Sequence, residues 1–137
     1  MSKRSLPGIN IQYPWSELLV TGKKTIETRS YPLPKKFINI ELAIIETPGK
    51  EGKKFGITKA RIIGTIIFSG SKKYESKLAW TKDYNKHLVT ETDPMYSFDS
   101  NKPKYGWIVE SVTILKKPVA PPEIRGIIFA KGCKVQF

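Results

Sequence analysis

The sequence predicts an α+β fold in which five or six mostly antiparallel strands form a small, closed or nearly closed β-barrel decorated by two or more helices. Three observations support this prediction. The chain has 137 residues, which favours one compact domain over 1–137. Its apolar fraction of 39% and aromatic fraction of 11% are sufficient for a folded core. Short segments with alternating apolar residues recur between glycines and prolines, which is typical of strands joined by turns.

The first predicted elements are a strand and a short helix, which follow a short flexible N-terminus over residues 1–6. Residues 8–12 (GINIQ) alternate isoleucines with polar residues and predict the strand. Pro14 suits the first turn of the helix, where its missing N–H group is not needed. Apolar residues at helical spacing then predict one buried stripe, formed by Trp15, Leu18 and Leu19.

Gly22 is placed to end this helix in the left-handed conformation. Residues 24–30 (KTIETRS) alternate polar and β-branched residues and predict a second strand, which Pro32 and Pro34 close off.

The rest of the chain predicts further strands, one helix and one loop. Residues 37–45 predict a half-buried strand with Ile38, Ile40, Leu42 and Ile44 on one face. In residues 61–70, a predicted strand, Gly64 marks a bulge or a close approach of another backbone. The other predictions are a surface loop over 48–56, a helix over 74–89, a strand over 105–115, and one or two strands over 123–137 with a turn near Gly132.

The chain is strongly basic. Lysine and arginine total 24 against 12 acidic residues, which gives a net charge of +12 and a pI near 9.8. The lysines include five doublets dispersed along the sequence, at 23–24, 35–36, 53–54, 72–73 and 116–117. This distribution favours a charged folded surface over a disordered basic arm. We therefore expect RNA, another single-stranded nucleic acid or a nucleoside as the partner.

Several classes of protein are disfavoured by composition. The single cysteine, Cys133, leaves no internal disulfide framework, and we expect a reducing, cytoplasmic location. The N-terminal segment lacks the apolar region of a signal peptide, and no apolar run is long enough to span a membrane. With one histidine and no glycine-rich phosphate loop, the sequence predicts no metal site and no cofactor. It gives no indication of oligomeric state.

Three charged residues follow the predicted helix within a few positions: Lys24, Glu27 and Arg29. Side chains alternate along a strand, so Glu27 and Arg29 share a face, and a turn after Gly22 can redirect Lys24 toward them. Together they would offer a point charge, an acceptor and a planar donor fork, which suits a phosphate and the edge of a base. The alternative is a solvated strand whose exposed ion pair contributes only about 0–1 kcal/mol.

This pattern, G-x-K-x-x-E-x-R, resembles that of the ASCH family, a branch of the PUA-like barrel superfamily. Residues 12–22 (QYPWSELLVTG) resemble the family's lead-in to the motif, and residues 104–111 (KYGWIVES) resemble its late aromatic strand. The resemblance implies a PUA-like β-barrel whose ligand cleft is lined by Lys24, Glu27 and Arg29. It also implies that the chain binds nucleic acid or a nucleotide there, for which we expect RNA or a modified base.

Aromatic residues near the motif are candidates for stacking on a base. Tyr13 and Tyr31 lie beside prolines, and we expect them to line the cleft. Trp107, in an alternating strand, is either a core residue or a stacking platform. Trp15 shares the helix stripe, and we expect it in the core.

The alternative function is catalytic. Glu91 lies four residues after His87, and this spacing resembles a segment of a bacterial ASCH enzyme that removes the acetyl group from N-acetylated cytidine. The resemblance implies Lys24 as the residue that activates a nucleophile and Glu91 as general base. That enzyme has a threonine at the position of Glu27, and a neighbouring carboxylate would keep Lys24 protonated. Glu91 is otherwise a loop carboxylate.

Two further alternatives remain open from the resemblance. One is a metal-dependent ribonuclease that uses the same cleft. The other is a protein-interaction module without catalytic activity. Binding is the first interpretation.

Overall fold

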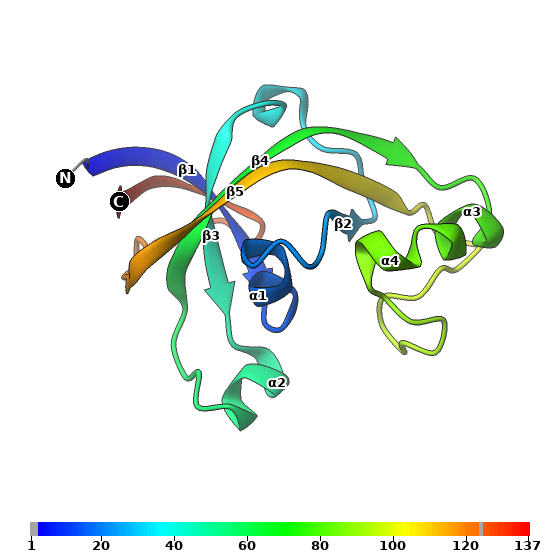
Figure 1. Ribbon diagram of the computed structural model, residues 1–137, viewed down its shortest axis with the longest axis horizontal. Coiled ribbons are helices and arrows are strands. Elements are labelled where there is room, and N and C mark those ends of the chain that lie inside the picture. Colours follow the sequence, from blue (N-terminus) through cyan, green and yellow to red (C-terminus); the bar gives the residue numbers. More distant parts are fainter. Residues whose placement is uncertain (1–2, 124) are drawn as a thin grey trace.

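The computed structural model describes residues 3–123 and 125–137, which form an α+β fold around one six-stranded mixed sheet (Figure 1). The strand order is β2-β5-β4-β3-β1-β6. β1 and β3 pair in parallel, and the other four pairings are antiparallel. The strands are β1 (Lys3–Gln12), β2 (Ile26–Arg29), β3 (Glu41–Thr47), β4 (Arg61–Lys73), β5 (Tyr105–Val119) and β6 (Phe129–Gln136).

The sheet is open, so the predicted closure into a barrel is not confirmed. β2 and β6 end the strand order, and no ladder joins them within the described residues. A physical reason lies in β2, which has four residues and is followed by Pro32 and Pro34. Proline has no N–H group to donate, so this edge of the sheet offers little for a closing partner.

The first strand begins earlier than its pattern predicts. Residues 3–6, expected in a flexible terminus, pair with β6 as part of β1, while residues 1 and 2 lie outside the described part of the chain. A Cβ on Gly8 would lie 2.5 Å from Cys133 Sγ, so the glycine permits the close approach of β6.

Helix α1 (Trp15–Val20) follows Pro14, which is its N-cap rather than a residue of its first turn. The buried face of the helix consists of Ser16, Leu19 and Val20, whereas Trp15 and Leu18 are only partly buried. The predicted stripe was therefore one residue out of phase. Gly22 has φ +81°, which confirms the predicted left-handed exit.

Left-handed residues divide two of the predicted elements. Asn39 (φ 61°) interrupts the strand predicted over 37–45, so β3 begins at Glu41 and Ile38 and Ile40 are 36% and 42% exposed. A 3-10 helix, η1 (Lys35–Phe37), precedes it. In place of one helix over 74–89 there are two, α3 (Lys77–Lys82) and α4 (Tyr84–His87), and Leu88 (φ 64°) ends the second.

Two glycine-rich segments also differ from prediction. The segment expected to be a loop contains helix α2 (Gly49–Lys54). Gly132, expected in a turn, lies within β6 with φ +66°. Gly64 behaves as predicted, because the ladder between β4 and β5 shifts register there and the two backbones approach closely.

Helix α1 packs against β1, β3, β4 and β5, and α4 packs beside β2. The long ribbon of β4 and β5 curves over α1 and carries α3 and α4 at its far end (Figure 1). Among the described residues, no helix is both long enough and apolar enough to cross a membrane.

Candidate functional site

A cavity of about 450 Å³ lies where β1, α1 and β2 meet two connecting segments. Its volume is within the range typical of small-molecule sites. The connections are those between α4 and β5 and between β5 and β6. The lining residues are Asn10, Gln12, Trp15, Lys24, Glu27, Thr28, Arg29, Thr47, Val89, Tyr96, Glu123, Arg125, Gly126 and Ile127.

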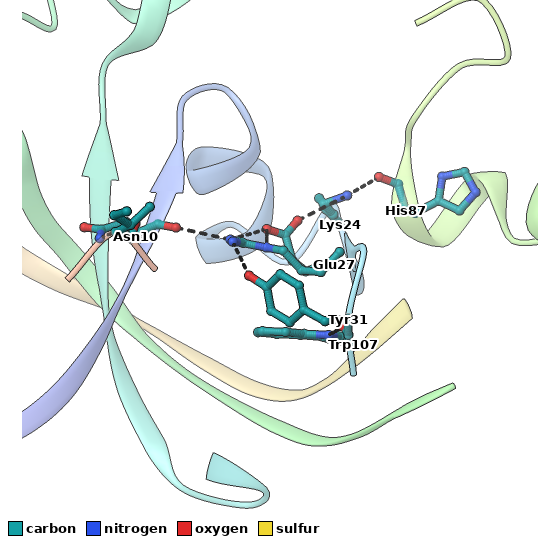
Figure 2. Close-up of polar contacts among 8 residues, drawn as sticks. Asn10, Lys24, Glu27, Tyr31, His87 and Trp107 are labelled. Carbon is teal, nitrogen blue, oxygen red and sulfur yellow. Dashed lines mark hydrogen bonds and ion pairs between the residues drawn. The ribbon is translucent and has the colours of Figure 1, made fainter. Parts of the chain in front are cut away.

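Glu27 is buried in this cavity between two cations. Its Oε2 accepts hydrogen bonds from Nη2 and Nε of Arg29, at 2.9 and 3.2 Å. Its Oε1 lies 3.8 Å from Nζ of Lys24. Figure 2 shows the carboxylate between Lys24 and the main chain of Asn10. The structure thus brings together the three charged residues of the motif.

Lys24 is the most deeply buried cation of the site, with 1% of its surface exposed. Its Nζ donates to the main-chain oxygen of His87 and lies 4.9 Å from the ring centre of Trp15. Burial lowers the pKa of Lys24 to about 8. The effect of burial is larger than that of the Glu27 carboxylate, which raises the pKa. We expected Glu27 to keep Lys24 protonated, but burial outweighs the carboxylate in the direction of the pKa shift, so the pKa lies only slightly above neutral pH. With a pKa of about 8, Lys24 is still mostly protonated at pH 7.

The Arg29 guanidinium has partners on several sides. Besides Glu27, it donates from Nη2 to the main-chain oxygen of Asn10 at 3.1 Å and from Nη1 to the Tyr31 hydroxyl at 3.4 Å. It also lies 5.5 Å from the ring centre of Trp107. Arg29 therefore fixes the orientation of Glu27 and ties β2 to β1, which are not neighbours in the sheet.

His87 contributes its main chain to the site, because both ring nitrogens are engaged elsewhere. Its Nδ1 accepts from the main-chain N–H of Val89 at 2.9 Å. The proton is therefore on Nε2, which donates to the main-chain oxygen of Trp80 at 2.7 Å. Burial lowers the pKa of this imidazole. In Figure 2 its ring is directed away from Lys24.

Comparison with known proteins identifies the fold. No family model and no curated sequence matches the chain. Among solved structures, ASCH from Zymomonas mobilis superposes with a TM-score of 0.62 at 17% identity, over 82% of this chain and 71% of that one. Its serine-to-alanine variant gives 0.64 at 15% identity, over 91% and 86%. Its tyrosine-to-phenylalanine variant gives 0.62 at 17% identity, over 85% and 76%. The chain has an ASCH fold.

Within this ASCH fold, three aromatic residues predicted to bind ligand do not line the cavity. Tyr13 packs against Phe55 instead, with ring centres 6.0 Å apart. Trp107 is fully buried, and its Nε1 donates to the main-chain oxygen of Tyr31 at 3.0 Å. Tyr31 lies edge-on to that indole and reaches the site only through the Arg29 guanidinium. Trp107 and Tyr31 therefore contribute to the site indirectly, by packing against the Arg29 guanidinium.

The aromatic residues that line the cavity are Trp15 and Tyr96, with ring centres 5.9 Å apart and planes at 88°. Trp15 was expected in the core, and the rotation of α1 by one residue turns it partly toward the cavity. Tyr96 lies in an irregular connection, so no periodic pattern indicates it.

Glu91 is separated from the motif. It is exposed, accepts a hydrogen bond from the Thr81 hydroxyl at 3.4 Å, and does not line the cavity. The chain leaves α4 through the left-handed Leu88, and of the residues near Glu91 only Val89 reaches the cavity wall. Among the described residues, no three His, Cys, Asp or Glu side chains are grouped to hold a metal ion.

Sequence reasoning also missed Asn10 and the segment between β5 and β6. The Asn10 side chain donates from Nδ2 to the main-chain oxygens of Gly126 and Ile127, at 2.9 and 3.0 Å. Glu123 and Arg125 of the same segment line the cavity. The prolines and isolated charges of this segment form no motif. Its position at the cavity depends on contacts with Asn10, which is distant in sequence.

Proposed function

We propose that the chain is a nucleic-acid or nucleotide-binding domain that holds one base, of RNA or of a modified nucleoside, in the cavity. The observation that carries the proposal is the buried carboxylate of Glu27 between Lys24 and Arg29 in a cavity of about 450 Å³. A buried charged cluster that faces an open space is characteristic of a ligand site, because its charges are costly to desolvate.

The cluster is suited to the hydrogen-bonding edge of a base. Oε2 of Glu27 is held by Arg29, while among the described residues Oε1 has only the longer contact with Lys24. Oε1 can therefore accept from an exocyclic amine or a ring N–H group. The Lys24 ammonium can donate to an adjacent carbonyl oxygen of the same base.

Trp15 and Tyr96 provide the apolar surface that a base requires. Their rings are nearly perpendicular, so a planar ligand can stack on one ring and contact the edge of the other. Stacking on an aromatic side chain contributes about 1–3 kcal/mol per base. The net charge of +12 would draw a polyanionic chain to the surface around the cavity.

The test is calorimetric titration of the protein with nucleosides and with short single-stranded RNA. Glu27→Gln keeps the shape of the side chain but removes the charge, and we expect at least a tenfold loss of affinity, about 1.4 kcal/mol. Glu75→Gln, an exposed carboxylate outside the cavity, is the matched control. Tyr96→Leu tests stacking without touching the buried charges. The proposal fails if folded Glu27→Gln and Tyr96→Leu proteins bind as tightly as the parent.

A second function, hydrolysis of N-acetylated cytidine to cytidine and acetate, is favoured by one observation. The pKa of Lys24 is lowered to about 8, which leaves a fraction of neutral amine able to accept a proton near neutral pH. Release of cytidine at about 1 per second or faster, abolished in Lys24→Ala, would establish this activity. Because Glu91 does not line the cavity, Glu91→Ala should leave any such activity unchanged.

A further inference from the structure

We infer that Arg125 binds the phosphate of the nucleotide whose base occupies the cavity, so that the site prefers a nucleotide or RNA to a free nucleoside. This inference rests on the proposed function and assigns the side chain that distinguishes these ligands. Its first support is that the two cations of the motif are already engaged. Arg29 donates to Glu27, Asn10 and Tyr31. Lys24 is buried against the His87 carbonyl, the Trp15 ring and Glu27.

Arg125 differs from both. It lines the cavity, yet its side chain is exposed to solvent. Nη1 donates to the main-chain oxygen of Pro122 at 2.9 Å, and within the described part of the chain Nε and Nη2 have no partner. A guanidinium with free donors on one edge can bind two phosphate oxygens at once.

The charges that line the cavity also depend on Arg125. Three cations (Lys24, Arg29 and Arg125) and two carboxylates (Glu27 and Glu123) give a formal charge of 3 − 2 = +1. Without Arg125 the lining would be neutral. The lining itself therefore carries a net positive charge only while this arginine is present.

The segment that carries Arg125 is held in place from the sheet. Asn10 donates from Nδ2 to the oxygens of Gly126 and Ile127, and its main-chain N–H donates to Ile128 at 2.8 Å. The main-chain oxygen of Asn10 accepts from Arg29. One residue of β1 thus connects the segment beside Arg125 with the buried charges. Because the main chain beside Arg125 is already held in place, less conformational entropy is lost when a ligand binds.

The experiment compares each ribonucleoside with its 5′- and 3′-monophosphates by calorimetric titration at low salt. For the parent protein we expect a monophosphate to bind at least about tenfold more tightly than its nucleoside. Arg125→Ala should remove this preference, by weakening the binding of the monophosphate by a larger factor than that of the nucleoside. Arg125→Lys should retain only part of it, because an ammonium lacks the planar fork. The more tightly bound monophosphate shows which phosphate Arg125 contacts.

The control is Lys116→Ala, which changes the net charge equally at an exposed position of β5 outside the cavity. The inference is overturned if Lys116→Ala matches Arg125→Ala, if Arg125→Ala weakens nucleoside and monophosphate by the same factor, or if the parent shows no preference. A parent that binds nucleosides without preferring monophosphates would leave the proposed function intact. A parent that binds neither nucleoside, monophosphate nor RNA would overturn both.

Discussion

Lys24 shows how one residue sets the electrostatics of the site. Its ammonium is taken out of water, and its compensation comes from a carboxylate at 3.8 Å, a carbonyl and an indole ring. A carboxylate at that distance is not a close hydrogen-bonded partner. The cost of burial therefore outweighs the attraction, and the pKa falls from 10.5 to about 8.

This lowered pKa predicts a pH dependence of stability. Below pH 8 both folded and unfolded chains carry the proton, so the folded state bears the full cost of a buried cation. Between pH 8 and 10.5 the folded state has lost the proton and the unfolded state has kept it, so the free energy of unfolding rises with pH. Denaturant titrations across this interval measure the free energy of unfolding at each pH. For the parent it should rise by up to about 3 kcal/mol more than for Lys24→Met. Lys23→Met, at the exposed neighbouring position, should follow the parent. Parallel curves for parent and Lys24→Met would show that Lys24 titrates normally.

Arg29→Lys should also be destabilising, although it conserves charge. A lysine ammonium cannot reproduce the planar fork that serves Glu27, Asn10 and Tyr31 together. We expect a loss of about 2–3 kcal/mol in the free energy of unfolding, because buried hydrogen bonds to a charged group are lost. Thermal denaturation provides the measurement, with Arg125→Lys as the exposed control. A melting temperature equal to that of the parent would show that the contacts of Arg29 contribute nothing to stability.

At this scale, alternation along a strand was enough to predict that Glu27 and Arg29 share a face, and the turn at Gly22 was enough to place Lys24 near them. The aromatic residues were not predictable in the same way. A shift of one residue in the buried face of α1 decides whether Trp15 faces the core or the cavity. Tyr96 and Arg125 lie in irregular connections, where contacts distant in sequence decide the position.

At the scale of elements, periodicity indicated most strands but not their interruptions. Asn39 and Leu88 both adopt left-handed backbone conformations that are uncommon for residues other than glycine. Asparagine tolerates this conformation better than most residues, so Asn39 carries a weak signal that the alternation of isoleucines outweighs, whereas Leu88 carries none. Asn39 donates its N–H to Phe68 at 2.8 Å, and this contact between distant segments stabilises the turn.

Two glycines of β4 offer a matched test of close packing. A Cβ on Gly64 would lie 2.4 Å from the Thr113 oxygen and 2.4 Å from Val20 Cγ2, whereas a Cβ on Gly70 would meet nothing within 4 Å. Gly64→Ala must push the β5 backbone or α1 away, and we expect it to destabilise the fold by about 1–3 kcal/mol. Gly70→Ala should be neutral or slightly stabilising. Denaturant titration distinguishes them, and equal effects would contradict the close approach.

At the scale of the molecule, length and alternation predicted an α+β domain with mostly antiparallel strands. They did not predict that β1 and β3 pair in parallel or that the sheet stays open. Alternation shows which side chains share a face, but it carries no information on which strand lies beside it or in which direction. β1 and β3 are separated along the chain by α1, β2 and η1, and a parallel pair requires a long crossover connection of this kind.

The net charge of +12 predicts a strong dependence of RNA affinity on salt. Binding of a polyanion releases condensed cations, so the logarithm of affinity should fall linearly with the logarithm of salt concentration. Titration of short single-stranded RNA from low to physiological salt measures the slope. Binding of an uncharged nucleoside in the same cavity should change little and serves as control. RNA affinity that is independent of salt would argue against binding through this charged surface.

Because the sheet is open, exposed lysines on its edge also affect self-association of the protein. An unpaired strand edge can pair with the edge of another copy, and such pairing leads to aggregates. β2 is only four residues long, and β6 presents the exposed Lys131 and Lys134. Mutual repulsion between these charges would keep two β6 edges apart. Substitutions that neutralise lysines across the surface, made to weaken contact with RNA, would therefore also remove the protection of this edge and promote insoluble protein.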